Sequence, residues 1–236
     1  MENYTLNYFK TFADDMKKSL QAVFDAYNGY FVQEAIPAFG SIANAGNVTK
    51  INFDSTAHRN CFTDYVLLEQ RVNKYKAYEI FLEEQKEAEE IALLNKFVPS
   101  FEKSYTSLFR IIDIDIEEGI IYFDDVLEVN EGQEIAIVDK TLAKTIDKNP
   151  VNMNFLMFFR FIPFLGDFID LNDEEETLKG MSAGYIYFFD PREERTIIKE
   201  YEKMAAKVRV SKSSSKRQIA FTELDKKYGK KLLLNK

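Results

Sequence analysis

The chain has 236 residues, of which 46% are hydrophobic, including 21 Phe and 13 Tyr. This is enough apolar material to form a folded core without disulfide or metal cross-links, so a chain that is disordered throughout is excluded. With Cys61 as its single cysteine the chain has no intrachain disulfide, which fits a reducing compartment. The first residues lack the basic start and apolar run of a secretory signal. The longest apolar stretch, residues 155–171, is interrupted by Arg160 and Pro163. We therefore expect a cytoplasmic protein without a membrane span.

The net charge of −8 hides an asymmetry. Residues 201–236 carry 11 Lys and Arg against 3 Asp and Glu, a balance of +8, so residues 1–200 carry the remaining −16. An acidic body with a basic C-terminal segment is the least random feature of the composition.

The first 103 residues read as helical. Apolar side chains recur at helical spacing over residues 9–27, and Gly29 is placed to end that helix. Residues 37–48 shift to Ala, Gly, Ser and Asn, which favours a loop or linker. Residues 53–98 indicate two or three further helical pieces.

Alternating patterns follow. Residues 108–116 alternate, with Leu108, Arg110 and Ile112 on one side, and Glu117-Glu118-Gly119 separates them from a second run at 120–123, so we predict a β-hairpin. Further strands are predicted at 134–138, 155–161, 164–169 and 185–189, with a break at Pro163. Six short strands in this span favour an antiparallel sheet or a small barrel.

The strongest local signal is Asp190-Pro191-Arg192-Glu193, which combines an N-cap aspartate, a proline at the first helical position and a glutamate at the third. It predicts a helix that starts at residue 191. Residues 211–215 read as polar linker, and residues 216–236 as a short helix or a mobile end.

The expected fold class is therefore α+β: a helical N-terminal half, an antiparallel β-sheet or small barrel in the middle, a C-terminal helix and a basic tail. The expected segments are 1–48 (long helix and linker), 49–103 (helical), 104–190 (β module), 191–210 (C-terminal helix) and 211–236 (basic tail).

The sequence offers little for catalysis. His58 is the single histidine, and with Cys61 it provides two of the four ligands that a zinc site needs within one chain. A serine or cysteine nucleophile also needs a nearby general base, and His58 is the only histidine that could act as one. The nine glycines form no phosphate-binding loop. We therefore expect no enzymatic activity and no cofactor.

Clustered carboxylates leave one catalytic alternative open, because such clusters can hold Mg²⁺ for phosphodiester cleavage. Asp113, Asp115, Asp124 and Asp125 lie at or near the ends of the predicted hairpin. A second group, Asp167, Asp170 and Asp173, follows a later strand. In a chain with 39 acids, carboxylates near turns are also expected as caps and solubilising groups.

The basic C-terminal segment is the better lead for binding, because its cations suit an anionic partner and Phe221 and Tyr228 are able to stack on bases. A solvated or intramolecular role, against the acidic body, is the alternative. The candidate residues are Lys207, Arg209, Lys212, Lys216, Arg217, Lys226, Lys227, Lys230 and Lys231.

One stretch supports a family comparison. It begins at Phe62-Thr63-Asp64-Tyr65-Val66-Leu67, continues through residues 81–101 and 105–114, and ends at Gly119-Ile120-Ile121-Tyr122-Phe123-Asp124-Asp125-Val126-Leu127. Over about residues 60–170 it resembles uncharacterised bacterial proteins that often end in the small SEC-C zinc motif. The resemblance implies a bacterial, cytosolic, helix-plus-sheet protein. The zinc-motif cysteines are absent here, so the resemblance implies no zinc-mediated partner.

The expected function is that of a non-catalytic interaction or regulatory protein that acts by protein–protein contact in a bacterial or phage context. A nucleic-acid-associated protein that binds through its C-terminal segment is the alternative, and a metal-dependent hydrolase is the second alternative. The partner's identity, a host or phage role and homo-oligomerisation stay open.

Overall fold

The computed structural model describes residues 4–27, 32–45, 48–84, 89–129, 133–165, 177–208 and 213–232. Helices and strands combine into an α+β fold with a barrel-like sheet in the middle, so the expected fold class is confirmed. The helices are α1 (Tyr4–Tyr27), α2 (Val32–Phe39), α3 (Thr56–Leu68), α4 (Ala77–Glu84), α5 (Glu89–Lys103), α6 (Lys140–Asp147), α7 (Glu194–Val208) and α8 (Ser214–Tyr228), with 3-10 turns η1 (Pro150–Asn154) and η3 (Pro191–Glu193). The strands are β1 (Gly40–Ala45), β2 (Val48–Phe53), β3 (Arg71–Val72), β4 (Tyr75–Lys76), β5 (Tyr105–Asp115), β6 (Ile120–Asp125), β7 (Ile135–Val138), β8 (Leu156–Pro163), β9 (Leu178–Ser182), β10 (Tyr187–Phe189) and β11 (Gly229–Lys230).

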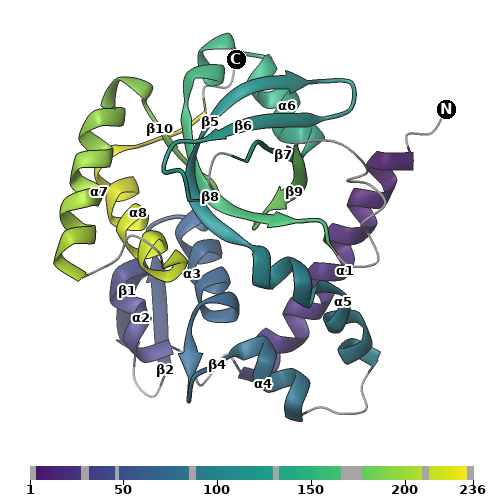
Figure 1. Ribbon diagram of the computed structural model, residues 1–236. Helices are drawn as coiled ribbons and strands as arrows, with labels where there is room; N and C mark the ends of the chain where they lie inside the picture. The colour runs from purple at the N-terminus through teal and green to yellow at the C-terminus, as the bar shows by residue number, and fades with distance from the viewer. Residues whose placement is uncertain are drawn as a thin grey trace.

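Five strands close into a ring. The order β8-β5-β6-β7-β9 is completed by pairing of β9 with β8, and Figure 1 looks into this ring. The β5–β6 hairpin and the end of β8 at Pro163 match the sequence prediction. The pairs are antiparallel except β7–β9, which is parallel. Strands β10 and β11 extend the sheet from β8. Closure removes the free edges of β5–β9, which explains how strands this short form a stable sheet.

Strand β8 and the first half of β5 are buried on both faces. Phe109, Phe123 and Phe159 meet in the barrel's own apolar cluster, where Phe109 and Phe159 lie 4.4 Å apart between ring centroids. Leu108 and Phe158 point to the opposite face and join a larger cluster with the helices. Burial on two faces is why β8 is an almost uninterrupted apolar run rather than an alternating one.

The regular alternation predicted for residues 108–116 is wrong beyond Ile111. The β5–β6 register shifts between Ile111 and Asp113, which marks a bulge, and Ile112 is 53% exposed. An extra residue in one strand turns the following side chains by one position, and sequence alternation does not reveal that shift.

The segment 37–48 was predicted to be a loop or linker. Its described residues, 37–45 and 48, instead belong to the end of α2 and to β1 and β2, which are paired from Gly40↔Phe53 to Ala45↔Val48. The small residues allow close backbone approach: a Cβ on Gly40 would lie 2.4 Å from the Asn52 carbonyl oxygen. The helices predicted over residues 53–98 are confirmed as α3, α4 and α5, with the short β3–β4 hairpin between the first two. The proposed helix end at Gly29 lies outside the described residues.

The segment predicted as a basic tail is folded into the protein. Helix α8 packs beside β5 and β10 (Figure 1), and the Phe221 ring stacks on Phe158 with 4.1 Å between centroids. Strand β11 then pairs with β10. Of the two expected alternatives, a short helix and a mobile end, residues 216–228 form the helix, and Ala220, Phe221 and Leu224 complete the helix-side core.

The predicted start of the C-terminal helix is confirmed. Asp190 accepts a hydrogen bond from the Arg192 amide at 2.9 Å and caps η3, which runs directly into α7. The Arg192 guanidinium also binds this carboxylate, at 2.6 Å. These hydrogen bonds from Arg192 lower the pKa of Asp190 to about 2.

We expect Asp190→Ala to lower the free energy of unfolding by about 1 kcal/mol at neutral pH, as is typical for loss of an N-cap. Because the folded-state pKa lies below the usual value, this stabilisation is complete above about pH 4 and fades as the pH falls towards about 2. Urea unfolding of both proteins at neutral pH and at about pH 3 checks this, with Glu202→Ala on the exposed face of α7 as the control. A difference that is equal at both pH values contradicts the assignment.

Candidate binding site

A buried arginine organises the helix side of the barrel. Arg160 on β8 is 1% exposed, and its guanidinium has three separate partners. Nε donates to Asp64 Oδ2 at 2.8 Å, Nη2 donates to Glu69 Oε1 at 2.5 Å, and Nη1 donates to Ser104 Oγ at 3.1 Å. A buried charge is tolerated only with such pairing, so Arg160 fixes the end of α3 against the barrel.

Helix α8 joins this network through Gln218, which is fully buried. Its Nε2 donates to Asp64 Oδ2 and to the Tyr185 hydroxyl. Burial raises the pKa of Asp64, and the adjacent Arg160 guanidinium opposes that change. Strand β8, helix α3 and helix α8 therefore meet at one carboxylate.

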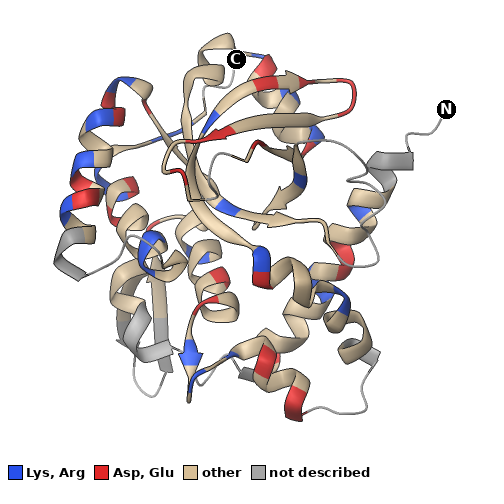
Figure 2. Cartoon of the chain, in the orientation of Figure 1, with Lys and Arg blue, Asp and Glu red and all other residues tan. Residues whose placement is uncertain are grey.

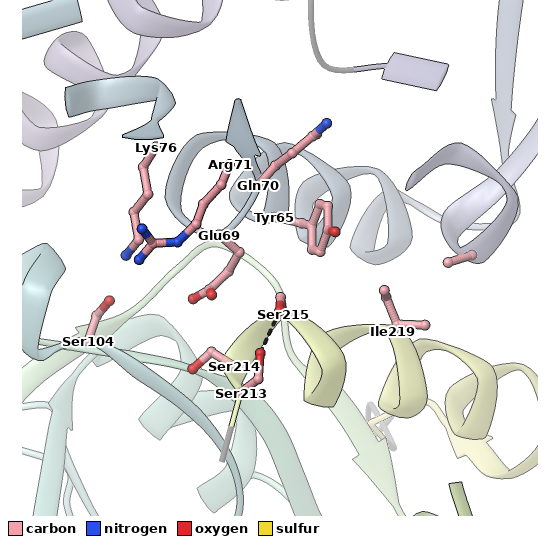
Figure 3. A pocket seen from close by; sticks show the side chains of 11 residues that line it. Tyr65, Glu69, Gln70, Arg71, Lys76, Ser104, Ser213, Ser214, Ser215 and Ile219 are labelled. Carbon is pink, nitrogen blue, oxygen red and sulfur yellow. Dashed lines mark hydrogen bonds between the residues drawn. The ribbon is translucent and has the colours of Figure 1, made fainter. Parts of the chain in front are cut away.

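A polar cleft of about 670 Å³ lies next to this network. It is formed by the end of α3, the β3–β4 hairpin and the start of α8 (Figure 3). Its walls include both Glu69 and Ser104, which are partners of Arg160, so the buried network reaches the cleft. The lining residues are Ala38, Tyr65, Glu69, Gln70, Arg71, Lys76, Ser104, Ser213, Ser214, Ser215 and Ile219.

Positive charge exceeds negative charge around the cleft. Figure 3 shows the Lys76 and Arg71 side chains extending into the same space, on the side of Glu69. Burial lowers the pKa of Lys76, and Arg160 and Arg71 lower it further against the raising effect of Glu69. Among the described residues, no carboxylate forms an ion pair with the Lys76 ammonium, which lies 5.7 Å from the centre of the Tyr78 ring. The charges of Glu69 and Glu79 act on Lys76, but a partly buried cation that makes no direct ion pair is a candidate for binding an external anion.

The opposite wall is the first turn of α8. Ser214 Oγ accepts hydrogen bonds from the Thr106 amide at 3.2 Å and from Arg217 Nη2 at 3.1 Å. Ser213 and Ser215 share a hydrogen bond between their hydroxyls at 2.6 Å (Figure 3). The hydroxyls are held in place by these bonds and present oxygen and O–H groups to the cleft.

The basic residues predicted to bind an anionic partner do not gather in one place. Arg217 is 2% exposed, and its Nε donates to the Thr106 carbonyl oxygen at 2.7 Å, so it faces the inside of the protein rather than an external anion. Lys216 follows the serines at the start of α8, and Lys231 lies after β11. Lys207, Arg209 and Lys212 lie outside the part of the chain whose side chains are described.

The remaining predicted lysines pair with acids of the same chain. Lys226 Nζ lies 3.3 Å from Asp54, and Lys227 Nζ lies 2.8 Å from Glu200. Lys230 Nζ lies 3.9 Å from Glu193. Figure 2 accordingly shows blue and red segments mixed along α7 and α8 rather than one blue surface. These contacts match the intramolecular alternative for the basic segment.

The two aromatic side chains considered for base stacking are also engaged. Phe221 is fully buried in the core, so a base has no access to its ring. The Tyr228 hydroxyl donates to Glu200 at 2.8 Å, and the Lys227 ammonium lies 4.8 Å from the centre of its ring.

His58 and Cys61 lie on α3, and both side chains are buried in the protein interior. His58 Nε2 lies 2.8 Å from Asp225 Oδ2, which joins α3 to α8. Cys61 is fully buried, and burial raises its pKa to about 12. A thiol with that pKa is protonated at neutral pH and is a poor nucleophile.

The four carboxylates of the β5–β6 hairpin do not form a cluster, and each makes its own local contacts. Asp125 is buried and accepts hydrogen bonds from the Ser107 hydroxyl and the amides of Leu127 and Val129. Asp124 pairs with Arg110 at 3.3 Å. The remaining two accept hydrogen bonds from nearby backbone amides, Asp113 from Ile114 and Asp115 from Glu118. Asp167, Asp170 and Asp173 lie outside the described residues. Within the described ranges, no three His, Cys, Asp or Glu side chains are placed to hold a metal ion.

Sequence reasoning missed the residues that shape the cleft. Its cations, Arg71 and Lys76, come from β3 and β4, and its three neighbouring serines from the start of α8, so the two walls are close only in the folded chain. One signal was present: Arg160 stands inside an otherwise apolar run, and a charge within a buried strand must have partners elsewhere. Helices long and apolar enough to cross a membrane are likewise not found in the part that the structure describes.

The chain belongs to a family of unknown function, DUF7986, whose model matches residues 9–235. Neither the comparison with curated proteins nor that with solved structures gave a match. The resemblance to proteins with SEC-C motifs stays a prediction.

Removing the buried guanidinium should leave Asp64 and Glu69 without their common partner. We expect Arg160→Leu to lower the free energy of unfolding by about 3–5 kcal/mol, as is typical when one member of a buried ion pair is lost. Arg110→Leu is a matched control on the neighbouring strand, because Arg110 is half exposed and pairs with Asp124 and Glu194. Its expected cost is below about 1 kcal/mol. Urea unfolding measures both, and equal losses would contradict the role given to Arg160.

The environment of Cys61 predicts slow chemistry at its thiol. In the native protein, labelling by a disulfide reagent should be at least about a hundredfold slower than in the guanidinium-denatured chain, because the thiolate is scarce and access is blocked. Stopped-flow absorbance measures both rates. Comparable rates would show that the thiol is reactive after all.

Proposed function

We propose that this protein is a non-catalytic binding protein that holds an acidic group of a partner protein in the cleft between α3, the β3–β4 hairpin and α8. The observation that carries the proposal is the Lys76 ammonium, which lines the cleft, is partly buried and makes no direct ion pair among the described residues. A carboxylate from a partner would supply the missing negative charge. Glu69 is committed to Arg160 and does not supply it.

The arrangement of the cleft's hydroxyls supports binding rather than nucleophilic catalysis. A serine nucleophile needs a base within hydrogen-bond reach. Ser214 Oγ instead accepts from an amide and a guanidinium, and Ser213 and Ser215 bond to each other. His58, the only histidine in the chain, is engaged with Asp225. Fixed donors and a desolvated cation suit the recognition of a carboxylate.

The nucleic-acid alternative stays a prediction. It has less support from the geometry, because Arg217 and Phe221 are buried and Lys226, Lys227 and Lys230 pair with acids of the same chain. A steep loss of affinity for DNA or RNA with salt in a mobility-shift assay would favour it over the proposal.

The proposal predicts that binding depends on Lys76. The full-length protein should capture a partner from a lysate of its native host, and the purified partner should bind Lys76→Met at least about tenfold more weakly, a loss of about 1.4 kcal/mol. Calorimetry on the purified pair measures the two affinities. Wild-type affinity should also fall with added salt, because the contact joins opposite charges.

Lys148→Met is the matched control, since Lys148 ends α6 and is not part of the cleft. It should leave the affinity unchanged. A partner that binds wild type and Lys76→Met equally well would rule out this cleft as the binding site. The absence of any specific partner would count against the interaction function itself.

A further inference from the structure

A second cavity, the apolar groove, lies between α1, α3 and the barrel strands β8 and β9 and has a volume of about 830 Å³. Its α1 wall runs from Phe9 to Phe24, and at about 1.5 Å of helix rise per residue this wall is about 22 Å long. The apolar side chains of the groove include Phe9, Met16, Leu20, Leu67, Ile162 and Phe164. An elongated apolar cavity of this size suits a molecule with an extended apolar chain.

Asp64 reaches the groove but adds little uncompensated negative charge to it. Its Oδ2 accepts hydrogen bonds from Arg160 Nε at 2.8 Å and from Gln218 Nε2. Arg160 is therefore the counter-ion of this carboxylate, and Glu69, the second carboxylate on Arg160, lines the polar cleft rather than the groove. A ligand in the groove meets Asp64 as one half of a buried ion pair.

Lysines outnumber the remaining aspartates along the groove. The charged residues of its wall other than Asp64 are Lys10, Asp14 and Lys17 on α1 and Asp139 and Lys140 at the start of α6. Among the described residues, none of the three ammonium groups takes part in an ion pair. The wall thus has one net positive charge, which a ligand with a single negative charge would balance.

The two charged residues at the start of α6 differ in what they still offer to a ligand. Asp139 Oδ1 caps the helix, where it accepts a hydrogen bond from the Leu142 amide at 2.9 Å. Lys140 Nζ donates to the Glu117 carbonyl oxygen at 2.8 Å. An ammonium group has three donors, so two N–H groups of Lys140 remain for a ligand. The cation is available, whereas the carboxylate already serves the helix.

The neutral polar side chains of the wall also provide donors. Asn60 Nδ2 gives one of its two hydrogens to the Gly184 carbonyl oxygen at 2.8 Å, so its second N–H is left. The Ser182 hydroxyl lines the groove and makes no hydrogen bond to another described residue. Thr63 Oγ1 instead donates to the Arg59 carbonyl oxygen at 3.1 Å. A carboxylate only accepts hydrogen bonds, so it matches the ammonium, amide and hydroxyl donors of this wall.

We infer that the apolar groove binds a small carboxylic acid with an extended apolar chain, in its ionised form. The carboxylate is held by Lys10, Lys17 and Lys140, and the chain lies along the apolar wall of α1. An amine would add to the positive charge of the wall. A phosphate monoester, with about −1.5 to −2 charges at neutral pH, would exceed the charge that the wall balances. The groove shares no lining residue with the polar cleft, and the inference does not rest on the function proposed for that cleft.

Octanoate is the probe, with octan-1-ol and octylamine as its neutral and cationic counterparts, each kept below micelle-forming concentration. Titration calorimetry on the full-length protein at neutral pH and low salt should show octanoate binding at least about fivefold more tightly than octan-1-ol, because charge-assisted hydrogen bonds are stronger than neutral ones. Octylamine should bind most weakly. Added salt should reduce the advantage of octanoate, since the lysines of α1 are exposed to solvent.

A triple variant, Lys10→Gln with Lys17→Gln and Lys140→Gln, tests the groups that hold the carboxylate. It should bind octan-1-ol as wild type does and should lose the preference for octanoate.

The matched control makes the same change in net charge at exposed lysines that do not line the groove, Lys18→Gln with Lys96→Gln and Lys144→Gln. It should keep the preference for octanoate. Lys76→Met, in the polar cleft, should also bind octanoate as wild type does.

Ala13→Trp places the chain of the ligand in the groove. The new ring fills the cavity from α1 and should abolish binding of both octanoate and octan-1-ol. Lys18→Trp, on the exposed face of the same helix, is its control and should bind as wild type does. Circular dichroism establishes that each variant is folded, and the triple lysine variant carries the test if Ala13→Trp does not fold.

Failure of octanoate to bind overturns the inference, and so does octylamine binding as tightly as octanoate. A preference for octanoate that survives the triple variant would show that these lysines do not hold the carboxylate. Binding that is lost in Lys76→Met would place octanoate in the polar cleft, and binding that survives in a folded Ala13→Trp protein would place it outside the groove.

Discussion

The packing of the helices against the barrel depends on the hydrogen bonds and ion pairs of the Arg160 guanidinium. Removing such a group from water costs several kcal/mol, and the structure offsets this with two carboxylates and a hydroxyl. Asp64 and Glu69 both come from the C-terminal half of α3 and its cap. Helix α3 is therefore fixed on the barrel in one rotation about its own axis, since any other rotation would leave a buried charge unpaired. The same carboxylates reach the two cavities, Glu69 the polar cleft and Asp64 the apolar groove.

The charge asymmetry of the chain has a counterpart in the fold. The basic C-terminal segment closes the helix side of the barrel: Gln218 completes the Asp64 network, and Phe221 stacks on Phe158. Its surface lysines then meet acids of the body, as Lys226 meets Asp54. Exposed pairs of this kind contribute at most about 1 kcal/mol each, so apolar packing holds α8 and the ion pairs add electrostatic fit. A run of positive charge at a chain end is thus compatible with a folded element.

Much of the fold was predictable where the signal was local. The β5–β6 hairpin follows from two strand-like runs on either side of the Glu117-Glu118-Gly119 turn, and the start of α7 follows from the cap at Asp190. What failed depends on tertiary contacts. The β1–β2 hairpin is built from small residues with weak strand preference, and the parallel β7–β9 pair joins segments about 40 residues apart. Helix α8 has almost no apolar periodicity of its own, because its buried face carries Arg217, Gln218 and Thr222 beside Phe221. The candidate site could not be predicted because its residues come together only through tertiary contacts, and Lys76, Glu69 and Ser214 share no sequence pattern.

The shared network determines which substitutions are informative about function. A change at Arg160 or Asp64 disturbs the cleft, the groove and the packing of α3 together, so a loss of binding there would not identify a site. Lys76 lines the cleft and makes no bond to the network, and Thr63 lines the groove with its donor on its own helix. Each therefore reports on one cavity alone. The buried arginine makes the two cavities geometrically dependent on each other, whereas most of the groups that line each cavity belong to that cavity alone.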